Sequence, residues 1–214
     1  MFDSLFIAFA TLFATVGPVD VALLYTALTP GVDARQRRTM AVKGVAIASG
    51  ILLVTALFGH ALLGFLGISL PALRIAGGIL LLLLAIDMVF ARQSGANSTT
   101  AEEEAEAVRS KDVSVFPLAT PLIAGPGSMG AAILLVADTL GDVWRIGQVV
   151  IALGLVMALT LALLLVADRT RQVLGVTGLN VITRVFGVLL AALSVQFILD
   201  GLVAIGLVPL LPKI

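Results

Sequence analysis

The sequence predicts an all-α polytopic membrane protein of about six transmembrane helices. Two compositional observations support this fold class: 60% of the 214 residues are hydrophobic and only 12% are charged. The mean hydropathy of +1.16 is higher than a soluble domain could bury inside one core. The third observation is spacing, because polar or Gly/Pro-containing segments divide the chain into stretches of roughly 20 apolar residues, the length that crosses a bilayer.

We expect six spans, over residues 4–29, 39–66, 70–91, 114–137, 143–167 and 181–209. No Lys or Arg precedes Arg35, so the first stretch lacks the positive start of a cleavable signal peptide and should remain as a helix. The second and third spans are not separated by charge. We divide them at Gly64, Gly67 and Pro71, because glycine and proline end helices.

A polar segment over 92–113 divides the chain into two halves, 1–91 and 114–214, of three predicted helices each. This segment contains four glutamates and cannot lie in hydrocarbon, so we expect a solvated cytoplasmic linker, with a docking site as the alternative. Of the 13 Lys and Arg residues, ten fall on the linker side of the membrane. The other three are Arg74, Arg145 and Lys213. Positive loops stay in the cytoplasm, so both termini are predicted outside it.

The two halves resemble each other at matching positions. Gly17-Pro18 in the first predicted helix and Gly125-Pro126 in the fourth are 108 residues apart. The five residues from Leu73 resemble the five from Thr183 at an offset of 110. Because each half holds an odd number of helices, the halves would insert in opposite directions. This predicts two inverted three-helix repeats, an architecture of many secondary transporters.

Each Gly-Pro pair is expected to break its helix inside the membrane. Proline lacks an N–H and clashes with the carbonyl four residues earlier, which frees backbone groups. It also suits the first turn of a helix, so each pair would start a half-helix whose positive end points at the midplane. Two such ends could hold a carboxylate, and freed carbonyls could hold an ammonium group, so a zwitterionic amino acid fits. The alternative is a pair of packing kinks.

The predicted substrate site comprises Gly17, Pro18, Asp20, Gly125, Pro126, Gly127 and Ser128. Asp20 is the clear intramembrane carboxylate, and such a group is costly enough to suggest a function. It could carry the coupling ion or contact a substrate ammonium group, and it could equally cap the second half-helix. Ser128 is the matching residue of the second half, and it could bind a carboxylate or cap its own helix.

The residue inventory limits the chemistry of the chain. It has no cysteine and one histidine, so thiolate chemistry and a His-rich metal site are excluded. Zero net charge argues against nucleic-acid binding, and no phosphate-binding loop of an ATPase is present. An intramembrane enzyme would need a second acid or His60 to meet Asp20. We expect no enzymatic activity, no metal and no cofactor.

Other polar residues have simpler interpretations. Arg74 and Arg184 are expected to anchor their helices at the membrane interface. His60 is expected to pack or lie at an interface, and Gln196 is a candidate cavity residue.

Three stretches resemble the MarC family of bacterial inner-membrane proteins: residues 67–78, residues 117–128 with Ala-Gly-Pro-Gly, and residues 195–201. The resemblance implies six helices in two inverted repeats. It also implies a proton- or cation-coupled transporter of small neutral amino acids such as glycine and alanine. The family usually has Asn or Asp before the first proline, whereas this chain has Gly17 before Pro18 and an acid at Asp20.

The leading hypothesis is therefore a multi-pass transporter in the bacterial inner membrane. It would carry glycine, alanine or serine together with H⁺ or Na⁺ and would have membrane lipid around it, with oligomeric state left open. Two alternatives remain: a non-transporting membrane scaffold, and an exporter of a different small solute.

Overall fold

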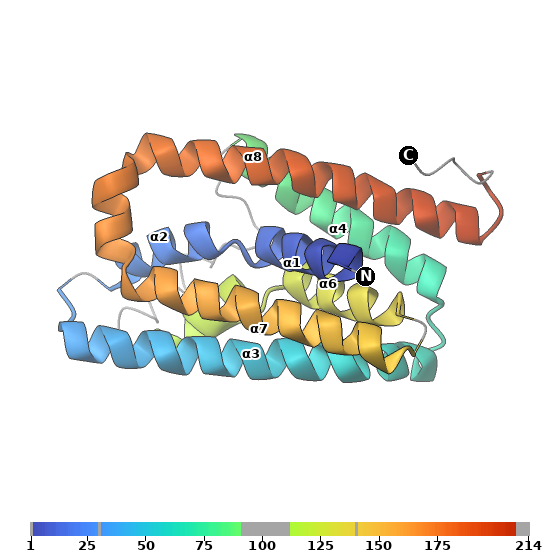
Figure 1. Cartoon of the computed structure of the whole chain (residues 1–214), viewed down its shortest axis with the longest axis horizontal. Coiled ribbons are helices and arrows are strands. Elements are labelled where there is room, and N and C mark those ends of the chain that lie inside the picture. Colours follow the sequence, from blue (N-terminus) through green and yellow to red (C-terminus); the bar gives the residue numbers. More distant parts are fainter. Residues whose placement is uncertain (1, 30, 91–111, 140, 209–214) are drawn as a thin grey trace.

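The computed structural model describes residues 2–29, 31–90, 112–139 and 141–208, and this part of the chain contains helices and no strand. The elements are α1 (Phe2–Val16), α2 (Pro18–Leu28), α3 (Ala34–Phe65), α4 (Leu70–Phe90), η1 (Ser114–Ile123), α6 (Pro126–Ala137), α7 (Val143–Leu165) and α8 (Ala167–Ala204). Figure 1 shows them as an elongated bundle whose long helices run roughly along one axis. Nearly all of the predicted linker, and the end of the sixth predicted span, lie outside the described residues.

Five helical segments are long and apolar enough to cross a membrane, and the bent pair of η1 and α6 makes a sixth. α1 and α2 together supply one of these spans, Ser4–Thr26. The all-helical prediction of about six spans is therefore confirmed at this level. The uncharged stretch between the second and third spans is divided where the Gly and Pro residues predicted, since α3 ends at Phe65 and α4 begins at Leu70.

Two helices extend beyond the predicted spans. α3 starts at Ala34 rather than at residue 39, because the Asp33 side chain caps it by accepting a hydrogen bond from the Arg35 N–H at 3.1 Å. α8 starts at Ala167, although only Arg184–Ala204 qualifies as a span. No proline occurs between residues 167 and 204, and helical hydrogen bonding does not stop where the hydrocarbon ends.

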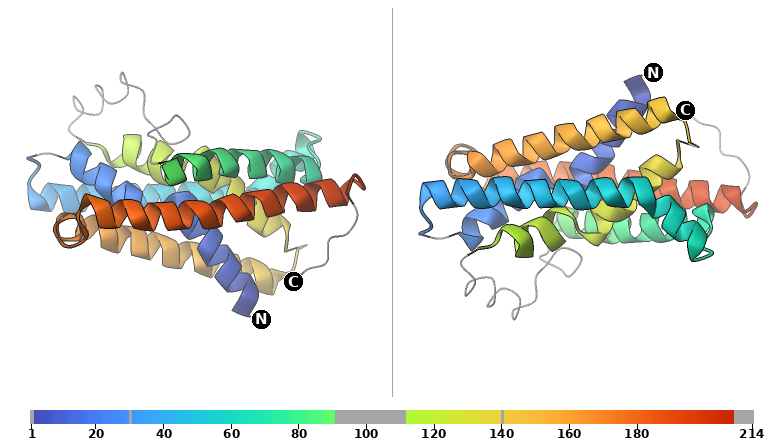
Figure 2. Two further views of the ribbon diagram at one scale, coloured as in Figure 1. Left: turned by 90° about the horizontal axis from the view of Figure 1, so that it is seen from above. Right: turned by 90° about the horizontal axis from the view of Figure 1, so that it is seen from below.

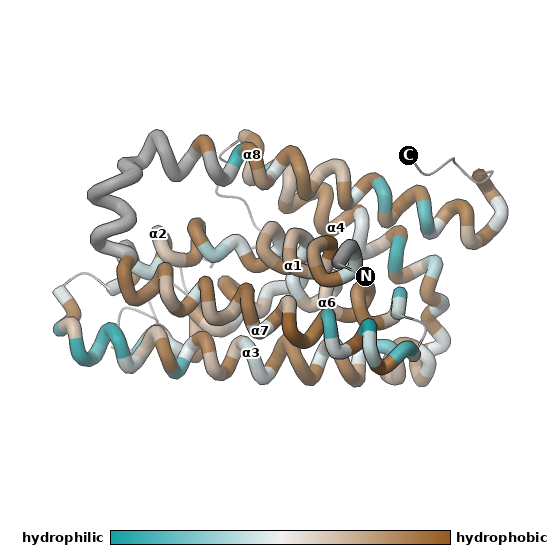
Figure 3. The backbone as a smooth tube through the Cα atoms, in the orientation of Figure 1, coloured by the Kyte–Doolittle hydropathy of each residue, from teal (hydrophilic) through white to brown (hydrophobic). Residues whose placement is uncertain are grey.

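The outer surface of the bundle is apolar. Large hydrophobic side chains lie exposed along α3, α7 and α8, among them Phe58, Leu62, Leu155 and Val188. In Figure 3 the middle of the bundle is largely hydrophobic, while hydrophilic residues gather at the start of α3 and at the opposite end of the bundle. Water would not stabilise so much exposed apolar area, whereas lipid tails solvate it. The chain is an integral membrane protein.

The helices of the two halves interdigitate. α1 and α2 pack on α7, and α2 also packs on α8, all from the second half. In the same way η1 and α6 pack on α3, and α6 also packs on α4, from the first half. The two further views in Figure 2 show the same interleaving from above and below. The core of the protein is therefore formed jointly by both halves.

The most extensive helix pair is α4 with α8, which run antiparallel. Glycines on both helices allow the close approach. A Cβ atom on Gly78 would lie 2.8 Å from the Ser194 carbonyl oxygen, and one on Gly187 would lie 3.1 Å from the Val89 backbone nitrogen. Small residues at such contacts let membrane helices gain van der Waals contact along their backbones.

Candidate functional site

The first Gly-Pro pair lies where α1 meets α2. Gly17 has φ 59° and ψ 57°, the left-handed conformation that favours glycine, and α2 begins at Pro18. Gly17 still donates its N–H to the Phe13 carbonyl at 3.0 Å, and its own carbonyl accepts from Val21 N–H at 3.0 Å. Proline has no N–H, so the Ala14 carbonyl lacks its usual helical donor. The chain is locally distorted here while continuing as one span.

The second Gly-Pro pair has a different geometry. Phe116 and Thr120 in η1 are extended, each directly before a proline, as the proline ring requires. The Ala124 N–H donates five residues back to the Ala119 carbonyl at 2.8 Å. Gly125 is extended, α6 begins at Pro126, and η1 and α6 are bent by 57°. The two pairs, which match in sequence, thus interrupt the backbone to different degrees.

Ser128 lies buried at this bend. Its Oγ hydroxyl is 2.8 Å from the Ile123 carbonyl oxygen and 3.1 Å from that of Gly125, and it donates to both as a shared hydrogen bond. The Gly125 carbonyl also accepts the first helical hydrogen bond of α6, from the Met129 N–H at 3.0 Å. Unpaired carbonyls are costly in a membrane, and the Ser128 hydroxyl adds a donor for both oxygens. The structure therefore places the Ser128 hydroxyl on its own bend, facing backbone oxygens.

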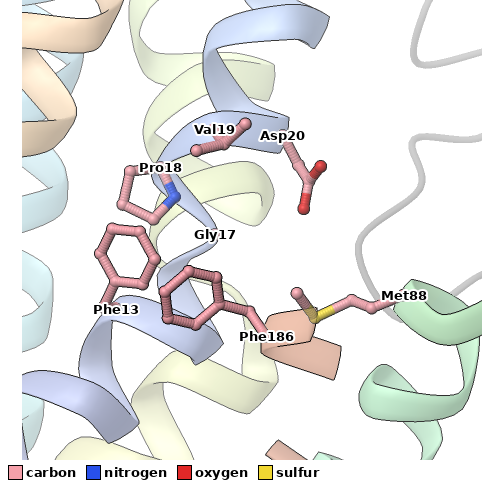
Figure 4. Close-up of a pocket in the computed structure, with 7 residues that line it drawn as sticks. All are labelled: Phe13, Gly17, Pro18, Val19, Asp20, Met88 and Phe186. Atoms are coloured by element: carbon pink, nitrogen blue, oxygen red, sulfur yellow. The ribbon is translucent and has the colours of Figure 1, made fainter. Parts of the chain in front are cut away.

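Asp20 is half-buried and lines two adjoining cavities. Figure 4 shows its carboxylate pointing away from Pro18, toward the side of Met88 and Phe186. The first cavity is lined by Phe13, Gly17, Pro18, Val19, Asp20, Met88 and Phe186. The second, of about 60 Å³, is lined by Ala14, Thr15, Val16, Gly17, Asp20, Val21, Leu24, Leu84, Met88 and Leu122. This volume exceeds the roughly 10–15 Å³ that a water molecule needs.

The walls around Asp20 come from both halves of the chain. Phe13 of α1 meets Phe186 of α8 with ring centroids 4.4 Å apart, and Met88 comes from α4. Sequence reasoning missed four of these residues: Leu84, Met88, Leu122 and Phe186. Nothing in the local pattern of the first three marks them as close to Asp20. One signal existed for Phe186, since it lies in the repeated motif that ends at Gly187.

The residues of the second Gly-Pro stretch line neither of these cavities: Gly125, Pro126, Gly127 and Ser128. A Cβ atom on Gly127 would lie 3.3 Å from Leu84 Cδ2, and Leu84 also lines the cavity beside Asp20. The structure thus groups Gly17 and Pro18 with Asp20, while the Leu84 side chain lies between this group and Gly127.

The other polar residues lie apart from Asp20. His60 and Arg184 are exposed, and Gln196 is exposed on α8, where its Nε2 donates to Asp200 Oδ1 at 2.7 Å. Arg74 donates its Nε–H to Asp138 Oδ1 at 3.0 Å, which ties the start of α4 to the residue that follows α6. Within the described ranges, no three His, Cys, Asp or Glu side chains gather as metal ligands would.

Comparison with known proteins extends these observations. Residues 2–205 match the family described as MarC family integral membrane protein. A UPF0056 membrane protein of Methanocaldococcus jannaschii is 38% identical over 197 residues, covering 92% of this chain and 94% of that protein. YvbG, a UPF0056 membrane protein of Bacillus subtilis, is 34% identical and covers 94% and 95%, respectively. A relative from Aquifex aeolicus is 35% identical, with 94% of each chain covered. No solved structure matches.

Proposed function

Because the chain belongs to the MarC family of integral membrane proteins, we propose that it is a secondary transporter of small neutral amino acids of the glycine, alanine and serine type, coupled to protons or sodium ions. The observation that carries the proposal is Asp20, an acid within the span Ser4–Thr26 that borders a small cavity beside an interruption of the helix. Placing a carboxylate within a membrane span costs free energy, so its presence suggests a role in binding an ion or a substrate ammonium group.

The helix packing supports an inverted repeat. Each half inserts its Gly-Pro segment against the helices of the other half: α1 and α2 against α7, η1 and α6 against α3. Two repeats related by a two-fold axis in the membrane plane would interlock in this reciprocal way. In such transporters, one set of helices rocks against the other and exposes the site to either side in turn. The cavity beside Asp20 has walls from both halves, so relative movement would change its shape.

The cavity chemistry supports a small zwitterionic substrate. The volume of about 60 Å³ leaves no room for a large side chain. The Asp20 carboxylate would attract the ammonium group, or would carry the coupling proton or sodium ion. In a more open state, the N–H groups in the first turns of α2 and α6, at the positive ends of these helices, would meet the substrate carboxylate.

Charge supports an orientation in the cell membrane. Arg35, Arg37, Arg38 and Lys43 lie on the first turns of α3, at the end of the bundle opposite the junction of α3 and α4. Since positive residues are retained in the cytoplasm, we place this end inside the cell, and both termini outside.

The test is uptake of labelled glycine, alanine and serine into vesicles that contain the purified protein, with an imposed pH or sodium gradient. We expect saturable flux that responds to one of the gradients. Asp20→Asn should reduce it by at least about tenfold, which corresponds to about 1.4 kcal/mol. Asp200→Asn is the matched control, because it removes an acid from the same kind of apolar span outside the cavity, and it should retain most of the flux.

Absence of saturable, gradient-sensitive flux of all three amino acids in vesicles with correctly folded protein would overturn the proposal. If Asp20→Asn and Asp200→Asn reduced the flux equally, the loss of flux would not depend on the cavity. This result would overturn the assignment of Asp20.

A further inference from the structure

A larger cavity lies between the start of α3 and the end of α7. Its volume is about 380 Å³, and it is lined by Ala34, Arg37, Arg38, Ala41, Leu164 and Leu165. None of these residues borders the cavities beside Asp20. The proposed transport site therefore leaves this cavity without a role.

The cavity has a charged side and an apolar side. α3 supplies two guanidinium groups, which are planar, permanently charged and able to bind phosphate oxygens in pairs. α7 supplies Leu164 and Leu165, and the small side chains of Ala34 and Ala41 keep the space between the helices open. No acid is among the described residues that line it. A ligand that fits must be anionic at one end and apolar at the other.

The charged side is held in place by α2. The Arg37 guanidinium lies 5.9 Å from the centre of the Tyr25 ring, a cation–π distance. The Tyr25 hydroxyl, on a fully buried side chain, donates to the Arg37 carbonyl. The nearby acid Asp33 accepts a hydrogen bond from the Arg35 N–H and caps α3. The backbone that carries Arg38 is thus preorganised.

The cavity lies where the apolar parts of both helices end. α7 ends at Leu165, and on α3 the basic residues Arg35 to Lys43 precede the uncharged apolar stretch, so we infer that both helices reach the headgroup level here. Basic pockets between transmembrane helices at the cytoplasmic boundary suit anionic lipid headgroups. We propose that this cavity binds one anionic membrane phospholipid, with its phosphate on Arg37 and Arg38 and the upper part of an acyl chain along Leu164 and Leu165.

The test measures lipid binding to the detergent-purified full chain by thermal stability and by native mass spectrometry. The probes are phosphatidylglycerol, phosphatidylcholine and the soluble sn-glycerol 3-phosphate. Phosphatidylglycerol should raise the melting temperature most and should be retained in the spectrum. Arg38→Gln should bind it about tenfold more weakly, as expected for the loss of a charged hydrogen-bond donor. Arg35→Gln is the matched control, because it removes the same charge three residues away, outside the cavity lining.

Three results would overturn the proposal. Equal weakening by Arg35→Gln and Arg38→Gln would indicate diffuse surface charge. Equal stabilisation by phosphatidylcholine would remove the preference for an anionic lipid. Equal binding of sn-glycerol 3-phosphate, dependent on Arg38, would make the ligand a soluble phosphate. If Arg38→Gln does not purify as folded protein, Arg38→Lys serves instead. It retains the charge and loses the planar fork, so it should bind phosphatidylglycerol more weakly than the wild type does.

Discussion

Phe13 on α1 packs against Phe186 on α8 with ring centroids 4.4 Å apart, and both rings line the cavity beside Asp20. This contact joins the first membrane helix to the last. It gives the cavity an apolar wall, which restricts the space next to the carboxylate.

Phe186→Ala should lower stability and enlarge that cavity. Loss of the ring contact and of part of its buried area should cost about 1–3 kcal/mol, below the cost of a fully buried phenylalanine. The measurement is the melting temperature in one detergent. Phe6→Ala removes a phenylalanine that is 71% exposed and should have little effect. Equal shifts for the two variants would show that the contact with Phe13 contributes nothing.

Gly78→Ala should destabilise the pair of α4 and α8. The new Cβ would lie 2.6 Å from Ile198 Cγ1 and 2.8 Å from the Ser194 carbonyl, so the helices must separate. We expect a loss of about 1–3 kcal/mol, as for other overpacked sites. In the control Gly50→Ala the Cβ meets nothing within 4 Å, and higher helix propensity should raise stability by up to about 1 kcal/mol. A neutral or stabilising Gly78→Ala would contradict the close approach.

Gly17→Ala should cost about 1–2 kcal/mol, because an L side chain disfavours the left-handed conformation. A steric clash does not cause this loss of stability, since the added Cβ would lie at an ordinary contact distance of 3.5 Å from Asp20 Oδ2. Gly17→Asn should cost less, because Asn adopts this conformation more readily. Melting temperatures of the three proteins test the order Gly, Asn, Ala. An Ala variant as stable as the wild type would show that the left-handed turn is not required.

The ion pair between Lys43 and Asp112 should make a small, pH-dependent contribution to stability. Lys43 Nζ donates to Asp112 Oδ2 at 2.8 Å, and this bond, with a hydrogen bond from the Ser114 N–H, lowers the pKa of Asp112 from 3.8 to about 2. A carboxyl with a lowered pKa stabilises the fold fully above 3.8 and loses that effect as pH falls through about 2.

Lys43→Met should therefore be less stable than wild type at neutral pH. The difference in stability between the two proteins should become smaller as the pH falls toward 2. Both side chains are about half exposed, so the effect should be only about 0.2–1 kcal/mol and should weaken in salt. Melting curves of both proteins between pH 7 and pH 2 test this. If the difference in melting temperature between Lys43→Met and wild type were unchanged at low pH, the effect of Lys43 would come from packing alone.

Local physics made much of the helix pattern predictable. Hydrocarbon thickness sets the length of an apolar segment, so composition alone indicated about six spans. The backbone requirements of glycine and proline placed a helix end at Phe65 and a helix start at Pro18. α3 and α8 begin before the spans predicted at residues 39 and 181, because hydropathy marks the edge of the membrane, whereas caps and hydrogen bonds mark the end of a helix.

The candidate site was predictable only in its local part. Gly17, Pro18 and Asp20 are neighbours in sequence and share a cavity. Their separation from Ser128 depends on the bend of 57° between η1 and α6 and on the position of the Leu84 side chain. Neither can be read from the periodicity of the sequence.

The sequence by itself determined which segments are helical, which are apolar enough for a membrane, and where glycine and proline interrupt them, because these properties depend on neighbouring residues. Only the tertiary structure decided that Met88 and Phe186 border Asp20, and that Arg74 pairs with Asp138. The physical reason is that nearly all faces of these helices are apolar, so hydrophobicity alone does not select a partner. Close packing at glycines such as Gly78 and Gly187, and a few polar pairs, select it instead.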